Sequence, residues 1–295
     1  MASRVEGLPP ADSPPFSDPS LAADLRAQDR DRWVSTLFAP AHHRDALVAL
    51  YAFNLEIARV RDIVSDPLPG EMRFQWWRDL LSGQARGDFG SHPVAAALLR
   101  AMARYNLPAE ALSTLIEART FDLYEDPMPS LNDLEGYCGE TSSIIIRLAT
   151  FILADGVDPG GADLVGHAGV AFALTGLLRA MPFHASRGQV FLPADMMQAH
   201  GVTRDDMLSA RDTPGLRSLL AELRARARHH LAETRLAIGS IGPALAPALL
   251  PVCLVEPYLR QMEATGYAPF RTPVSLPDWR AIWTVWRAAR RARCA

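Results

Sequence analysis

The chain has 295 residues, of which 49% are hydrophobic, and its 30 basic and 33 acidic residues give a formal net charge of −3. This composition supports a sizeable buried core and excludes a chain that is disordered throughout. The near balance of charge excludes attraction of nucleic acid by the field of the whole chain. Every basic residue is an arginine, so no lysine is available as a Schiff base or general base.

The helices are predicted from apolar runs of helical period that alternate with proline or glycine, while no convincing period-2 strand occurs. The pattern predicts an all-α fold. We expect a single large helical bundle over residues 21–295, because no link is long enough to mark a domain boundary. In chain order, the predicted helices are 19–38, 42–64, 71–81, 93–103, 108–124, 131–154, 162–181, 216–238, 244–265 and 277–291.

The cysteines and the first residues predict the compartment. Cys138, Cys253 and Cys294 are odd in number and lack metal-ligand spacing, which predicts reduced thiols in the cytoplasm or an equivalent matrix. Residues 1–20 are rich in proline and serine and carry acids, so they predict a disordered tail rather than a signal or transit peptide. The most apolar stretch, 241–255, is broken by prolines and is shorter than the roughly 20 residues of a membrane-spanning helix.

The first segment with chemical potential runs from Tyr51 to Asp66. It carries Glu56, Arg59 and Asp62, and the i, i+4 spacing of Asp62 and Asp66 would place two carboxylates on one helical face, where a divalent cation could bind. The alternative is a helix end with solvated carboxylates. Spacing alone favours this alternative, because exposed charges are usually solvated.

The second segment reads Leu178-Arg-x4-His-Ala-Ser-Arg-Gly-x-Val-Phe-Leu-Pro193. An apolar helix is expected to run into Pro182, followed by a turn at Arg187 and Gly188. This pattern resembles the second signature of the squalene/phytoene synthase family. By that resemblance, Ala180 and His184 stand where the family has metal-binding aspartates, and Phe183 also replaces an acid.

The first family signature has a weaker counterpart at Tyr51-Ala-Phe53. In an ungapped comparison Ala58 and Arg59 occupy the leading acidic positions, and Asp62 matches a carboxylate. A shifted comparison would use Asp62 and Asp66 instead. The resemblance continues through Arg73-x-x-Trp-Trp77, His92-Pro-Val94 and Gly166-His-x-Gly169, and it covers most of the chain from about Asp24.

The resemblance implies an isoprenoid synthase bundle with a central cavity. In the family, carboxylates on facing helices hold Mg²⁺ against the diphosphate of an isoprenoid. Alanine offers no ligand for Mg²⁺ and imidazole is a poor one. If the lost carboxylates contributed even about 5 kcal/mol of leaving-group stabilisation, their removal would slow the reaction by about 10³- to 10⁴-fold. We therefore expect no catalytic residue, no metal ligand and no cofactor, with Mg²⁺ required only if the chain is a divergent synthase.

A subgroup of the family is more similar still: that of the mitochondrial complex I assembly factor with a phytoene-synthase-like domain. The shared residues are Phe53-Asn-x-Glu56, Glu140-x-x-Ser143 and, above all, Pro182 and His184 within Leu178-Arg-Ala-x-Pro-aromatic-His-x-Ser-Arg187. This resemblance implies a protein needed to build the NADH:quinone oxidoreductase. Because no transit peptide is recognised, we expect a bacterial relative of that factor.

The residues expected to line the cavity or to bind a ligand are polar or aromatic residues of these motifs. For the arginines, binding of a phosphate or carboxylate and internal pairing with Glu56 or Asp62 remain open, whereas packing is the default for the histidine and the tryptophan. An acid such as Glu140, if buried, would need a partner. The candidates are Tyr51, Glu56, Arg59, Asp62, Trp76, Glu140, Arg179, His184 and Arg187.

The last predicted helix carries Trp279, Trp283 and Trp286 at i, i+4 and i+7, followed by arginines from Arg287 onward. Such a helix suits an anionic membrane surface or a partner groove. The alternative, slightly favoured from sequence, is that the tryptophans pack on the core.

Three functional hypotheses remain open. The first is a non-catalytic assembly or maturation factor whose partners are respiratory complex I subunits or assembly intermediates. The second is a divergent head-to-head prenyl diphosphate synthase, and the third is a module that holds an isoprenoid or another lipid in the cavity. We expect no nucleic-acid partner and a cytoplasmic location, with peripheral contact to the inner membrane as an extension.

Overall fold

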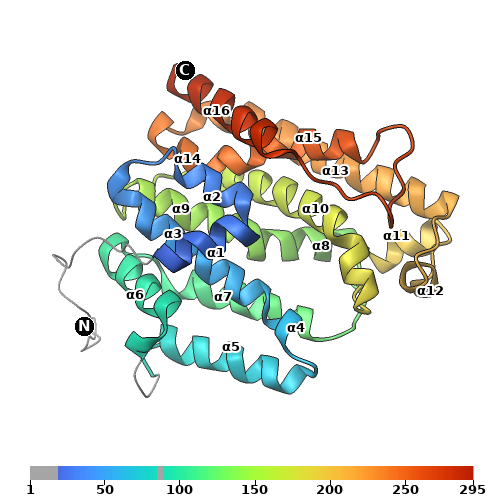
Figure 1. Ribbon diagram of the computed structural model, residues 1–295, viewed down its shortest axis with the longest axis horizontal. Helices are drawn as coiled ribbons and strands as arrows, with labels where there is room; N and C mark the ends of the chain where they lie inside the picture. The colour runs from blue at the N-terminus through green and yellow to red at the C-terminus, as the bar shows by residue number, and fades with distance from the viewer. Residues whose placement is uncertain (1–18, 85–88, 295) are drawn as a thin grey trace. The chain divides into compact units, whose positions relative to one another are not determined.

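The computed structural model describes residues 19–84 and 89–294 of the chain (Figure 1). Within these residues every regular element is helical and no strand occurs, which confirms the predicted all-α fold. Contacts between residues divide the chain into two compact units. Most of the predicted tail 1–20 lies outside the described residues, and its last two residues, Pro19 and Ser20, begin the first helix. The single domain from 21 to 295 stays a prediction.

Within the described part of the chain, the first unit comprises residues 19–84, 89–123, 144–160 and 241–248. Its central element is α3, which packs against α1, α6 and α9, while α5 packs against α7. The helices of this unit are α1 (Pro19–Gln28), α2 (Arg30–Thr36), α3 (Ala41–Ala58), α4 (Val60–Ile63), α5 (Pro67–Leu81), α6 (Pro93–Tyr105), α7 (Ala109–Thr120) and α9 (Ile144–Leu153), with 3₁₀ turns at Phe89–Ser91, Phe121–Leu123 and Pro243–Leu245 and with most of α14 (Ala246–Leu249).

The helix predicted over 42–64 ends earlier than expected, at Ala58. Arg59 interrupts it, the short α4 ends at Ile63, and Val64 has an extended backbone with φ −117° and ψ 144°. The extended residue means that Asp62 and Asp66 do not lie on one continuous helix. The expectation that their i, i+4 spacing places both carboxylates on one helical face is therefore wrong.

The second unit comprises residues 124–143, 161–240 and 249–295. Its two longest helices, α10 and α13, lie side by side, and α10 also contacts α8 and α15 (Figure 1). The helices are α8 (Leu131–Cys138), α10 (Ala162–Ser186), α11 (Ala194–Ala199), α12 (Arg204–Leu208), α13 (Pro214–Ala237), α15 (Val255–Gln261) and α16 (Asp278–Cys294), with a π-helical turn at Gly139–Ser143 and 3₁₀ turns at Ile238–Ser240 and Leu250–Leu254 (η6).

Helix α10 continues past Pro182, although the sequence predicts its end at Met181. Proline removes one backbone donor from a helix, but the residues after it keep helical geometry as far as Ser186. The predicted turn follows at Arg187 and Gly188, where glycine adopts a positive φ of 79°. Residues 182–186 thus form the last turn of α10, and the predicted turn at Arg187 and Gly188 ends the helix.

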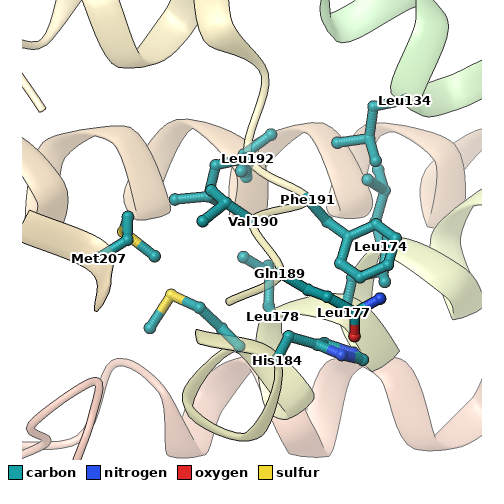
Figure 2. Close-up of a pocket in the computed structure, with 12 residues that line it drawn as sticks. Leu134, Leu174, Leu177, Leu178, His184, Gln189, Val190, Phe191, Leu192 and Met207 are labelled. Carbon is teal, nitrogen blue, oxygen red and sulfur yellow. The ribbon is translucent and has the colours of Figure 1, made fainter. Parts of the chain in front are cut away.

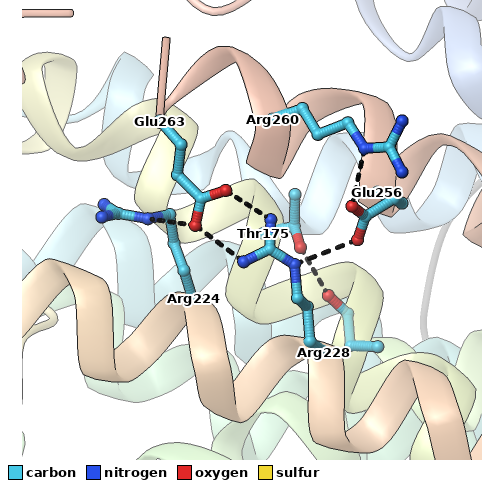
Figure 3. A network of polar contacts seen from close by, with 7 residues as sticks. Thr175, Arg224, Arg228, Glu256, Arg260 and Glu263 are labelled. Atoms are coloured by element: carbon cyan, nitrogen blue, oxygen red, sulfur yellow. Dashed lines mark hydrogen bonds and ion pairs between the residues drawn. The ribbon is translucent and has the colours of Figure 1, made fainter. Parts of the chain in front are cut away.

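An arginine network fixes α13 against the end of α15 (Figure 3). Both terminal nitrogens of Arg228 donate to the Glu263 carboxylate at 2.7 Å, and its Nε donates to Glu256 at 3.1 Å. These hydrogen bonds raise the pKa of Arg228, and the same contact with Arg228 lowers the pKa of Glu263. Arg260 adds a bond to Glu256 at 2.9 Å. The charges of the two helices therefore compensate one another.

Other helix boundaries differ from the prediction where local chemistry interrupts the backbone. The predicted helix 19–38 is split at Asp29, whose side chain caps α2 by accepting from the Arg32 N–H. The predicted helix 244–265 is a series of short 3₁₀ and α segments, because its prolines cannot donate to a continuous helix. The short helices α11 and α12 were not predicted at all.

One described helix, α10, is long and apolar enough to cross a membrane by length and composition alone. However, 56% of its apolar window is buried inside the protein. Such burial is also typical of a core helix, so the length of α10 is weak support for a membrane span.

Candidate functional site

In the first unit, Glu56 near the end of α3 pairs with His92 at the start of α6. The Ala95 N–H donates to His92 Nδ1 at 3.3 Å, so Nδ1 accepts and the ring proton is on Nε2. Nε2 lies 3.1 Å from Glu56 Oε1 and donates to that carboxylate. Burial raises the pKa of Glu56, against the lowering effects of His92 and Arg73. One histidine thus caps a helix and holds a half-buried acid.

Aromatic rings surround this pair. The His92 ring lies 5.1 Å from Trp76 and 5.6 Å from Trp77, measured between ring centroids. Trp77 in turn meets Phe53 edge to face at 5.0 Å. The predicted candidates Glu56 and Trp76 therefore come together through His92. His92 belongs to the His92-Pro-Val94 motif but is not among the predicted site residues. Offset and edge-to-face contacts of this kind stabilise the rings beyond their burial.

The other predicted candidates of this unit do not join the cluster. Tyr51 is buried beneath Arg32, and burial raises its pKa to about 12. It is a core residue in the structure. Arg59 is exposed at the break between α3 and α4, and Asp62 is exposed on α4.

In the second unit, the end of α10 carries Arg179, His184 and Arg187. The Arg179 guanidinium lies 3.6 Å from the centroid of the Tyr258 ring, and its Nε donates to the Val274 carbonyl at 3.3 Å. Arg187 lies over the ring of Phe183 at 4.3 Å. Both arginines therefore make cation–π contacts within their own unit.

His184 lines an apolar pocket (Figure 2). Its ring meets Phe191 at 4.8 Å between centroids, and leucines of α10 form much of the remaining wall. The free volume is about 20 Å³, which is room for about one water molecule. In this conformation the pocket is too small for a prenyl chain, so His184 serves here as a packing residue.

Glu140 lies in the π-helical turn Gly139–Ser143 and is exposed. Because Glu140 is exposed, water can solvate its carboxylate, and the need of a buried acid for a protein partner does not apply to it. Ser143, three residues further along the chain, is buried, and its hydroxyl donates to the Gly166 carbonyl of α10 at 2.9 Å. This turn approaches α10 so closely at Gly169 that a Cβ there would overlap Ser143 backbone and side-chain atoms. The Gly166-His-x-Gly169 motif is therefore a contact between helices.

A second polar cluster of this unit was missed from the sequence. Glu135 of α8 accepts hydrogen bonds from Arg226 and from His230 Nε2, the latter at 3.1 Å. His230 Nδ1 lies 2.9 Å from His167 Nδ1, so the two rings share one proton. Burial lowers the pKa of His230 despite Glu135. The adjacent histidines on α13 are the sequence feature that could indicate this cluster. However, no spacing rule links them to their partners Glu135 on α8 and His167 on α10.

One group of three potential metal ligands occurs among the described residues, and it lies outside the predicted site. His42, His43 and Asp155 have ligand atoms within 4.8 Å of one another. His43 Nε2 and Asp155 Oδ1 are 2.9 Å apart, and this contact lowers the pKa of Asp155. The Asp155 backbone has a positive φ of 52°. The direct contact joins His43 to Asp155, and His42 is the third potential ligand of the group.

Comparison with known protein families identifies the family to which this chain is related. The squalene/phytoene synthase family model matches residues 25–287. The chain belongs to the squalene/phytoene synthase family. This confirms the expected family and the isoprenoid synthase type of fold, whereas the central cavity stays a prediction.

Two curated relatives and one solved structure illustrate the range of the family. The chain is 32% identical to "NADH dehydrogenase (ubiquinone) complex I, assembly factor 6" of Bos taurus, over 83% of this chain and 74% of the relative. It is 27% identical to a phytoene synthase of Thermus thermophilus, over 88% of each chain. The crystal structure of squalene synthase HpnC from Alicyclobacillus acidocaldarius matches with a TM-score of 0.69 and 25% identity, over 86% of this chain and 98% of the other.

The α10 end does not fit the Mg²⁺ that the family resemblance implies. Mg²⁺ requires oxygen ligands in near-octahedral geometry. The only acid of α10 is Asp163, in its first turn, whereas the last turns hold Arg179, Ala180 and His184. The side chains present there offer positive charge and apolar surface instead of carboxylates.

Proposed function

We propose that this chain is an assembly or maturation factor for respiratory complex I and does not couple prenyl diphosphates. The observation that carries the proposal is the composition of the α10 end. By the family resemblance, Ala180 and His184 stand where synthases have metal-binding aspartates. His184 lines an apolar pocket with little free volume. Similarity to the bovine assembly factor over 83% of this chain supports the same conclusion.

The electrostatics of the two signature segments support it further. The α10 segment from Arg179 to Arg187 contains two arginines and no acid, so it repels a divalent cation. On α3 the half-buried carboxylate of Glu56 is already hydrogen-bonded to His92. A protein that only binds a partner has no need of a carboxylate cluster.

The proposed partners are complex I subunits or assembly intermediates. Complex I is a membrane enzyme, so the proposal places the chain in the compartment where that enzyme is built, cytoplasmic or equivalent, with peripheral contact to the membrane. An isoprenoid or another lipid in the expected cavity remains a further proposal. The pocket beside His184 offers no room for it without side-chain movement.

Deletion of the gene tests the proposal. We expect NADH:quinone oxidoreductase activity and the assembled complex on native gels to fall, while quinone content and succinate oxidation stay normal. Unchanged quinone content and succinate oxidation would place the defect in complex I itself and not in the supply of its substrate or in the rest of the respiratory chain. Intact complex I in the deletion strain would overturn the proposal.

Complementation provides the matched control. In the ungapped comparison, Asp62 is the carboxylate that aligns with a synthase acid in the first signature, and it is exposed. Asp62→Asn should therefore restore complex I as well as the wild-type gene does. Loss of rescue by this stable variant would indicate that the carboxylate performs chemistry.

A further inference from the structure

Helix α16 attaches to the protein through a narrow stripe of small side chains. Ala281, Val285 and Ala289 recur every four residues and are buried. The helix packs on the 3₁₀ segment η6 (Leu250–Leu254) of the same unit. This contact uses one side of α16 and leaves the rest of its surface outside the core.

Large apolar side chains occupy the neighbouring side and are exposed to solvent. The exposed fractions are 70% for Trp279, 43% for Ile282, 51% for Trp283 and 43% for Trp286. Their spacing of i, i+3, i+4 and i+7 places them on one face. The expectation that these tryptophans pack on the core is therefore wrong. Four large apolar groups on one helix form a patch of the kind that marks an interaction site.

Arginines border this face. Arg287 lies 4.5 Å from the Trp283 ring and Arg290 lies 5.0 Å from the Trp286 ring. Arg280 and Arg291 are exposed on the same border. In sequence, α16 carries five arginines and one acid, Asp278. The helix is thus strongly basic although the whole chain has a net charge of −3.

We propose that the exposed face of α16 (Trp279, Ile282, Trp283 and Trp286 with the bordering arginines) binds the surface of an anionic phospholipid bilayer. Tryptophan favours the boundary between acyl chains and headgroups. Arginine can lie beside it and hydrogen-bond lipid phosphates. The helix lies in the plane of the surface and does not span it, because the stripe from Ala281 to Ala289 keeps it on η6.

A bilayer accounts for this surface better than a protein groove does. A groove that covers the tryptophans would also have to neutralise arginines along the full length of the helix. An anionic bilayer supplies both an apolar boundary and a continuous negative surface. The inference rests on the exposure and charge of α16. It assigns the peripheral membrane contact of the proposed function to one surface, and it does not require that the chain act on complex I.

Vesicle co-sedimentation with the full-length protein tests the inference. We expect binding to vesicles that mix phosphatidylcholine with phosphatidylglycerol, weak binding to phosphatidylcholine alone, and loss of binding as salt rises. Tryptophan emission should shift to the blue when vesicles are added. Absence of binding, or equal binding to both kinds of vesicle, would overturn the inference.

Variants assign the binding to α16. Trp279→Ala, Trp283→Ala and Trp286→Ala together should weaken partitioning by at least about tenfold. Arg287→Gln with Arg290→Gln should weaken it by about fivefold for each charge. Because all these side chains are exposed, the unfolding temperature should not change.

Control substitutions keep the result specific to this face. The exposed pair Leu68 and Met72 on α5 is at least about as exposed as the tryptophans, and Arg235 is an exposed arginine on α13. Arg235 serves as the control because it is on α13 and not on α16. Substitution of Leu68 and Met72 by alanine, and of Arg235 by glutamine, should leave binding unchanged. Vesicle binding that survives the three tryptophan substitutions would also overturn the inference.

Discussion

The end of α3 and the end of α10 carry the two segments that resemble the acidic signatures of the family, and they have diverged in different ways. The α3 end holds an acid, Glu56, which is hydrogen-bonded to His92 among tryptophan rings. At α10 no acid remains, and Arg179 and His184 pack on aromatic rings. In both segments, the polar side chains are therefore engaged in contacts within their own unit.

This difference separates two kinds of contact, a polar pair at the α3 end and aromatic packing at the α10 end. A polar pair retains a charge whose pKa depends on its surroundings, so the α3 end should respond to pH. Apolar packing and cation–π contacts respond to volume instead, so the α10 helix should respond to changes in side-chain size. Substitutions can test each expectation separately.

The largest expected effect is on the packing of α10. Gly169→Ala places a Cβ where it overlaps Ser143, including backbone atoms that cannot move aside easily. We expect a loss of about 3 kcal/mol in the free energy of unfolding. The measurement is denaturant unfolding followed by circular dichroism.

Gly166→Ala is the matched control, because no atom lies within 4 Å of its Cβ. Alanine in this helix should be neutral or stabilise by up to about 1 kcal/mol. Equal effects of the two substitutions would show that the close contact with the π-helical turn does not fix α10.

The next effect concerns His92. His92→Ala removes the cap of α6, the partner of Glu56 and two ring contacts, and we expect a cost of about 2 kcal/mol. Asparagine is a good capping residue, so His92→Asn should recover about half of that loss. If the two variants are equally stable in thermal unfolding, the cap contributes nothing measurable to the stability.

A smaller effect is the pH dependence due to Glu56. Burial raises the pKa of its carboxyl above the ordinary value of 4.5, so the folded state binds its proton more tightly than the unfolded state does. Its contribution to stability is present below pH 4.5 and is lost as pH rises through the folded pKa.

Glu56→Gln removes this contribution but keeps an oxygen that accepts from His92. The wild type should therefore lose stability relative to this variant as pH rises above 4.5. The check is a series of denaturant curves for both proteins across this range. A difference that stays constant with pH would contradict the raised pKa.

The smallest effect is expected for the exposed charges. Arg187 lies over Phe183 at the surface and Asp62 is exposed on α4. Arg187→Gln and Asp62→Asn should each change the free energy of unfolding by less than about 0.5 kcal/mol. A magnesium-dependent rise in melting temperature that disappears in Asp62→Asn would instead show that this carboxylate binds a metal.

Sequence alone predicts the family, the helical class and most helix positions, because apolar periodicity and motif spacing are local. It does not predict that α10 continues through Pro182 to Ser186, since tertiary contacts can retain a helix after one backbone bond is lost. It also misplaces the end of the helix at Ala58, because no proline or glycine precedes the break.

The site is predicted less well than the fold. Glu56 and Trp76 meet through His92, but Tyr51 is a core residue and Glu140 is exposed. Helical spacing places Trp279 and Trp283 on one face, but it does not say whether that face is buried or exposed. Long-range partners such as Glu135 and His230 leave no local pattern.

The central claim is that the α10 end does not assemble magnesium for diphosphate departure. The most direct measurement is diphosphate release from farnesyl or geranylgeranyl diphosphate with Mg²⁺ and a reductant, with the phytoene synthase of Thermus thermophilus as a positive control. We predict that release with this protein is no faster than in buffer. Magnesium-dependent release at the rate of the control enzyme would contradict the account.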